Sequence, residues 1–174
     1  MKIEPFKENL NHKVIPMAQS ILVKSGNHIP MLLSYDKNGI EKISDLSDLF
    51  SVTDKDILYG ILGSFLDESD SVAYILVTEA WKKKVEKGKL RETLEDGKSL
   101  HHDKDSEEVL VFQWDFRLDN VRDYGSISYK FENNFGTIVI DYDNPIIVEG
   151  KDAQKSFSRA SNLLGGGAAG ENKN

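Results

Sequence analysis

The segment Ser71–Trp81, with the sequence SVAYILVTEAW, is the longest apolar run in the chain and ends at a run of lysines. At the two-residue period of a β-strand, both of its sides are mostly apolar. Such a strand is typical of the centre of a sheet that is covered on both faces. We therefore expect a central strand over this segment, with Glu79 as the one acid on a covered side.

Two helices and a hairpin are predicted before this strand. Helical spacing of apolar residues, bounded by proline at the start and glycine at the end, predicts a helix over Pro16–Lys24. A second amphipathic helix is predicted over Asp54–Leu66, after a threonine N-cap. Between them, the turn residues Asp36–Gly39 predict a hairpin that joins His28–Tyr35 to Ile40–Ile43.

Several strands are predicted after the central one. Strict alternation over Glu108–Arg117 predicts a strand with one aromatic face, and Ser126–Phe131 alternates in the same way. A turn at Glu132–Asn134 leads to strands over Gly136–Tyr142 and Ile146–Val148. The short connections indicate an antiparallel meander. We predict a two-layer α+β fold, with an antiparallel β-meander of about four to six strands and two main helices packed on one face.

The aromatic residues of these late strands have two interpretations. Phe112, Trp114, Tyr129 and Phe131 could form an exposed platform on which nucleic-acid bases stack. Alternating aromatic residues on strands are more often part of a core. We favour the core, because the helices need an apolar sheet face to bury.

Length and composition indicate one globular domain. The chain has 174 residues, of which 39% are hydrophobic and 29% charged. We expect a single α+β domain over residues 1–149, and a loose helix with a flexible glycine-rich tail over residues 150–174. No apolar run reaches the length of about 20 residues that a membrane span needs. The first residues lack the apolar centre of a signal peptide, so we expect a cytoplasmic protein without a membrane contact.

Charge and cysteine content narrow the classes of function. The net charge of −7 argues against non-specific nucleic-acid binding by the whole surface. The chain has no cysteine, which excludes disulfides, thiol nucleophiles and thiolate metal sites. We expect no cofactor, because the sequence contains no Walker loop and no dinucleotide fingerprint.

A basic run follows the central strand and opens a long connection that extends to Ser106. Its basic residues are Lys82, Lys83, Lys84, Lys87, Lys89 and Arg91, against the single acid Glu86. Such a run is usually a solvated segment. Contact with phosphate or with an acidic partner is the alternative interpretation.

Two groups of residues are candidates for chemistry. His101, His102 and Asp103 could bind a metal ion, but their spacing matches no known ligand pattern and favours a solvated loop. Glu79 and Asp115 could act as acid and base or hold a divalent ion, if neighbouring strands place them on one face. For Glu79, an ion pair with Arg117 or with one of the lysines 82–84 is the favoured interpretation.

The order of elements resembles that of a diffuse group of small uncharacterised α+β proteins. The resemblance rests on V-T-E-A-W at Val77–Trp81, the charged loop after it, and E-E-V-L-V-F at Glu107–Phe112. It implies one domain and no particular activity.

The leading hypothesis is a non-enzymatic cytoplasmic interaction module. It would self-associate, through a strand edge or an aromatic face, or bind a protein partner. One alternative is a small metal-dependent or acid-base hydrolase that uses Glu79, Asp115 and the His101–His102 loop. The other is phosphate or nucleic-acid contact through the segment Lys82–Arg91.

Overall fold

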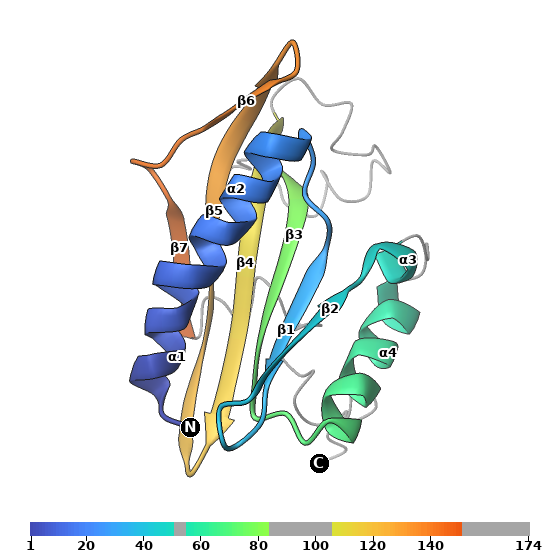
Figure 1. Ribbon diagram of the computed structural model, residues 1–174, viewed down its shortest axis with the longest axis vertical. Helices are drawn as coiled ribbons and strands as arrows, with labels where there is room; N and C mark the ends of the chain where they lie inside the picture. The colour runs from blue at the N-terminus through green and yellow to red at the C-terminus, as the bar shows by residue number, and fades with distance from the viewer. Residues whose placement is uncertain (51–54, 84–105, 151–174) are drawn as a thin grey trace, which may run out of the picture.

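A computed structural model of the chain describes residues 1–50, 55–83 and 106–150 (Figure 1). Its central strand is β3 (Ala73–Lys83), which lies between β1 (Met31–Tyr35) and β4 (Ser106–Leu118) in an antiparallel sheet. The strand predicted over Ser71–Trp81 is therefore confirmed, with slightly later ends.

Four more strands complete the sheet. They are β2 (Glu41–Asp45), β5 (Val121–Asn134), β6 (Thr137–Ile140) and β7 (Ile146–Glu149). The order is β2-β1-β3-β4-β5-β6, and β7 also pairs with β5. β4 occupies one side of β5. The other side of β5 is shared by β7, which pairs with residues 125–128, and β6, which pairs with residues 131–134. The prediction of an antiparallel α+β fold is confirmed, with seven strands in place of four to six.

The sheet is not a simple meander at its first edge. β1 lies between β2 and β3 and is antiparallel to both, so β2 and β3 are parallel to each other. Parallel strands need a long crossover, which usually contains a helix. The connection from β2 to β3 contains α3 (Ser47–Phe50) and α4 (Lys55–Glu68). The helix predicted over Asp54–Leu66 thus serves as this crossover.

Helices cover both faces of the sheet. α1 (Ile3–Asn9), the π-helical turn η1 (Leu10–Val14) and α2 (Ile15–Ser25) pack on one face, called here the N-terminal face. α4 packs on the opposite face over β1 and β3, and this is called the α4 face (Figure 1). The predicted two-layer arrangement with both helices on one face is therefore wrong.

The composition of β3 explains this correction. Ile75 and Val77 point to the N-terminal face, and Tyr74 and Leu76 point to the α4 face. All four side chains are buried. A strand that is apolar on both sides must be covered on both sides, since exposed apolar area costs about 25 cal/mol per Å².

A proline explains the π-helical turn in the N-terminal helix. Pro16 has no N–H and its ring crowds the carbonyl of residue 12, which disfavours regular α-helical hydrogen bonding there. The N–H of Ile15 donates instead to the Leu10 carbonyl, five residues earlier. The helix ends at Gly26, whose left-handed φ of 76° is readily adopted by glycine. The helix predicted over Pro16–Lys24 is confirmed as the last part of this longer helical segment.

The aromatic side of β4 is core. Phe112, Trp114 and Phe116 are buried under the N-terminal helix, as predicted. Phe6 of α1 packs between the rings of Tyr35 and Phe116, with centroid distances of 5.5 Å to each. Because these rings are buried, they cannot form a platform on which nucleic-acid bases stack. They also cannot form a surface through which the chain self-associates.

Candidate functional site

Glu79 anchors the chain as it enters β1. It is partly buried on the N-terminal face, and its Oε1 accepts a hydrogen bond from the backbone N–H of His28. Burial raises the pKa of the Glu79 carboxyl; the His28 N–H opposes this rise, and the Glu108 carboxylate adds to it. Of the ion-pair partners predicted for Glu79, Arg117 is wrong, because it lies on the α4 face; the side chains of the lysines 82–84 lie outside the described part of the chain.

Asp115 is buried on the α4 face. Its Oδ2 accepts hydrogen bonds from Arg117 Nε at 3.0 Å and Nη2 at 2.7 Å, and Arg122 Nη2 lies 3.8 Å away. Burial raises the pKa of Asp115, and the two guanidinium groups oppose that rise. Within the described part of the chain, no hydrogen-bond donor reaches Asp115 Oδ1.

The structure does not bring the two candidate carboxylates together. Glu79 lies opposite Leu110, whereas Asp115 lies opposite Tyr74. Leu110 and Asp115 are an odd number of residues apart in β4, so the two acids point to opposite faces. At about 3.3 Å per residue, they are also offset by roughly 16 Å along the strands. They therefore cannot share a proton or a metal ion within this sheet.

The other predicted site residues fall largely outside the described residues. These are His101, His102, Asp103, Lys84, Lys87, Lys89 and Arg91. The backbone of Lys82 and Lys83 lies in β3. In residues 1–50, 55–83 and 106–150, no group of three or more His, Asp or Glu side chains could hold a metal ion. Among the same residues, no helix has both the length and the apolar composition needed to cross a bilayer.

His28 is a buried titratable group that the sequence analysis did not single out. Both of its ring nitrogens are buried and have no hydrogen-bond partner in the described structure. Burial lowers the pKa of His28 from 6.5 to about 4. Its position just before β1, beside apolar Ile29 and Pro30, is the only signal in the sequence that could have indicated this burial.

His28 should make the fold sensitive to mild acid. The unfolded chain binds a proton at His28 below pH 6.5, whereas the folded chain does so only near pH 4. Stability should therefore fall between about pH 6.5 and 4, by up to about 3 kcal/mol, and then level off. Urea unfolding across this range should show the loss in the native chain, and His28→Phe should remove it.

The exposed His12 provides the matched control for this prediction. A His12→Phe variant should keep the native pH dependence, because the His12 side chain is exposed, whereas that of His28 is buried. Burial raises the pKa values of Glu79 and Asp115, which makes stability rise as the pH falls, opposite to the effect of His28. Both acids are present in the native chain and in the two variants. An unchanged profile for His28→Phe would show that these carboxyls or others dominate.

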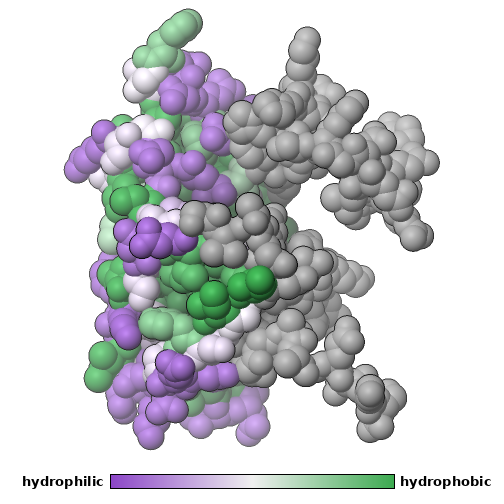
Figure 2. Space-filling model, turned by 90° about the vertical axis from the view of Figure 1, so that its right-hand side faces the viewer, coloured by the Kyte–Doolittle hydropathy of each residue, from purple (hydrophilic) through white to green (hydrophobic). Residues whose placement is uncertain are grey.

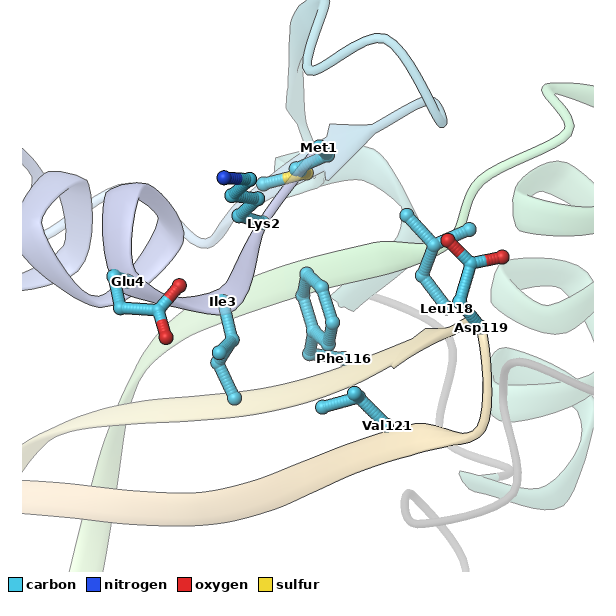
Figure 3. A pocket seen from close by; sticks show the side chains of 8 residues that line it. All are labelled: Met1, Lys2, Ile3, Glu4, Phe116, Leu118, Asp119 and Val121. Atoms are coloured by element: carbon cyan, nitrogen blue, oxygen red, sulfur yellow. The ribbon is translucent and has the colours of Figure 1, made fainter.

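A shallow pocket lies at the end of the sheet where β4 turns into β5 (Figure 3). Its volume is about 210 Å³, and its apolar residues are Met1, Ile3, Phe116, Leu118 and Val121. Figure 3 shows their side chains between the charged residues Glu4 and Asp119, with Lys2 beside Met1. Ligand sites for drug-sized molecules usually measure about 300–1,000 Å³, so this pocket fits a single side chain better than a cofactor.

The two margins of the sheet differ in character. β2 has charged residues at Glu41, Lys42 and Asp45, as edge strands that resist pairing usually do. β7 reads Ile-Ile-Val-Glu, and Ile147 in its middle is 56% exposed. No strand in the described ranges pairs with its outer side. The margin formed by β7 and β6, rather than β2, is therefore the one that can accept another strand; the outer side of β6 has no partner strand in these ranges either.

A second apolar surface lies on α4. Figure 2 shows the side of the molecule that carries α4 and β2, with apolar side chains gathered near its middle and hydrophilic ones above and below. Ile57 and Ile61 are exposed there, one helical turn apart. A helix surface of this kind has no unpaired backbone groups, unlike the outer side of β7.

No family model, curated protein or solved structure matches this chain.

Proposed function

We propose that this chain is a non-enzymatic interaction module that self-associates by pairing β7 with β7 of a second copy. The observation that carries the proposal is the apolar outer edge of β7, which has no partner strand in the described part of the chain. An added strand gains main-chain hydrogen bonds along such an edge. The offset between Glu79 and Asp115 favours this function over acid-base hydrolysis.

Charge supports a second copy as the occupant. A two-fold axis through Ile147 places Ile147 opposite itself and Ile146 opposite Val148 in antiparallel strands. Glu149 then faces Pro145, so no like charges oppose each other. The same operation on β2, centred on Ile43, would place Glu41 opposite Asp45, and directly opposed like charges destabilise a strand pair.

The position of β7 is held by contacts with α1. Glu149 Oε1 lies 3.4 Å from Lys7 Nζ, and Lys7 also pairs with Asp123 at 2.7 Å. These contacts hold the C-terminal end of β7 in place, so the edge proposed to pair belongs to a strand that is fixed at this end. Val139 and Tyr142, exposed on and just after β6, add apolar area near this margin.

Ile147→Lys should abolish the dimer that forms by β7 pairing. The substitution places two like charges opposite each other at the centre of the pair, in a strand of only four residues. Sedimentation velocity over a range of protein concentrations should show loss of the dimer, with the far-UV spectrum unchanged.

Ile43→Lys is the matched control, since Ile43 is 50% exposed at the middle of β2, the strand at the opposite margin of the sheet. It should leave the dimer intact. A native chain that remains monomeric at all concentrations would refute the proposal. Loss of the dimer in Ile61→Lys but not in Ile147→Lys would also refute it and would assign the interface to α4.

A further inference from the structure

Phe135 lies at a position where a phenylalanine does not contribute to the stability of the folded monomer. Residues 135 and 136 form the two-residue turn between β5 and β6, since Asn134 pairs with Thr137. Both have positive φ, 54° for Phe135 and 88° for Gly136. Turns of this kind favour Asn-Gly, whereas a bulky residue with positive φ is strained. The predicted turn at Glu132–Asn134 is thus displaced to these residues.

The side chain of Phe135 is also fully exposed, at 109% of its reference area. It therefore combines backbone strain with apolar area left in water. A residue that breaks local rules without packing in its own fold is typical of a functional contact. Single aromatic side chains that fill a pocket are the usual anchors of protein interfaces.

We propose that Phe135 of one copy inserts into the pocket between Ile3, Phe116 and Val121 of another copy. The pocket is open, has an apolar floor and is of a size for one side chain (Figure 3). This contact is separate from β7 pairing, because neither Phe135 nor the pocket belongs to β7.

The contact must form between two copies. Val121 begins β5 and Phe135 follows its last residue. At about 3.3 Å per residue, the two ends of this strand lie roughly 45 Å apart. The β5–β6 and β4–β5 turns lie at opposite ends of the sheet in Figure 1. A head-to-tail contact of this type joins different surfaces and can extend along a row of copies.

Charge favours a protein partner over a lipid surface. The residues beside Phe135 are the uncharged Asn133, Asn134 and Thr137, and the nearest charge is the acid Glu132. Anionic membranes recruit clusters of lysine and arginine, which this turn does not have. Uncharged amides are compatible with the mixed rim of the pocket, where Lys2 lies with Glu4 and Asp119.

Disulfide trapping can test the contact, because the native chain has no cysteine. All chains carry Ile147→Lys, so the result does not depend on β7 pairing. One chain carries Thr137→Cys beside the tip, and the other carries Lys2→Cys at the pocket rim. After mixing and oxidation, mass spectrometry should detect the mixed disulfide. Adding Phe135→Asn to the first chain should reduce its yield about 30-fold, as for the loss of an anchor worth about 2 kcal/mol.

Two controls decide the outcome. A chain with Ser20→Cys, on the exposed side of α2, should form little mixed disulfide with the Thr137→Cys chain. Phe135→Asn should also raise the urea midpoint of the monomer, because asparagine tolerates positive φ better than phenylalanine. Equal trapping with and without Phe135, equal trapping at Ser20, or a lower midpoint for Phe135→Asn would overturn the proposal.

Discussion

Gly125→Ala should destabilise the fold by about 3 kcal/mol, and Gly125→Val by more, as expected for overpacking in a core. A Cβ on residue 125 would lie 2.6 Å from Trp114 Cζ2 and 2.7 Å from the Val148 carbonyl oxygen. The second of these atoms is backbone, so it cannot move without shifting β7. Urea unfolding followed by circular dichroism measures the loss directly.

The surroundings of Trp114 explain why the indole cannot move aside. Trp114 lies directly opposite Gly125 in the β4–β5 register, and its ring fills the space that a side chain would take. Its Nε1 donates to Asp123 Oδ2 at 2.8 Å, and Lys7 Nζ lies 4.0 Å from the ring centroid. Moving the ring would break both of these partly buried contacts.

Gly60→Ala is the control for this prediction. Gly60 lies within α4, and a Cβ there would meet no atom within 4 Å. Alanine has a higher helix propensity than glycine, so this variant should gain about 0.5–1 kcal/mol. Native stability in Gly125→Ala would contradict the placement of the Trp114 ring over residue 125.

Phe6→Ala should cost about 3–5 kcal/mol, the usual range for removing a buried aromatic ring. Phe6 is 0% exposed and lies between Tyr35 of β1 and Phe116 of β4. The substitution leaves a cavity under α1, where the helix meets the sheet. The urea midpoint and the near-UV spectrum should both report the loss.

Phe135→Ala applies the same chemical change to an exposed ring. It should shift the free energy of unfolding by no more than about 0.5 kcal/mol, since no packing is lost. If the two variants were equally stable, α1 would not be docked on the sheet as described. The comparison separates loss of packing from any general effect of losing a phenylalanine.

The candidate site was only partly predictable from the sequence. Strand periodicity assigned Glu79 and Asp115 to strands and marked the aromatic side of β4 as core. It could not state that these acids point to opposite faces, because that depends on the β3–β4 register. The exposed edge of β7 could not be predicted either, because the order of the strands decides which of them lie at the edge of the sheet.

The sequence by itself determined the elements. The run SVAYILVTEAW specified a central strand covered on both faces, and periodicity located α2, α4, the long strand β4 and the middle of β5, whose first residues, Val121–Gly125, were expected in a turn. These features follow from local spacing of apolar residues, which each segment carries alone. Tertiary structure decided which surfaces are available for contacts. It placed β1 between β2 and β3, left the apolar strand β7 at a margin of the sheet, and separated Phe135 from its proposed pocket. These depend on pairings between residues distant in the chain, which no local pattern encodes.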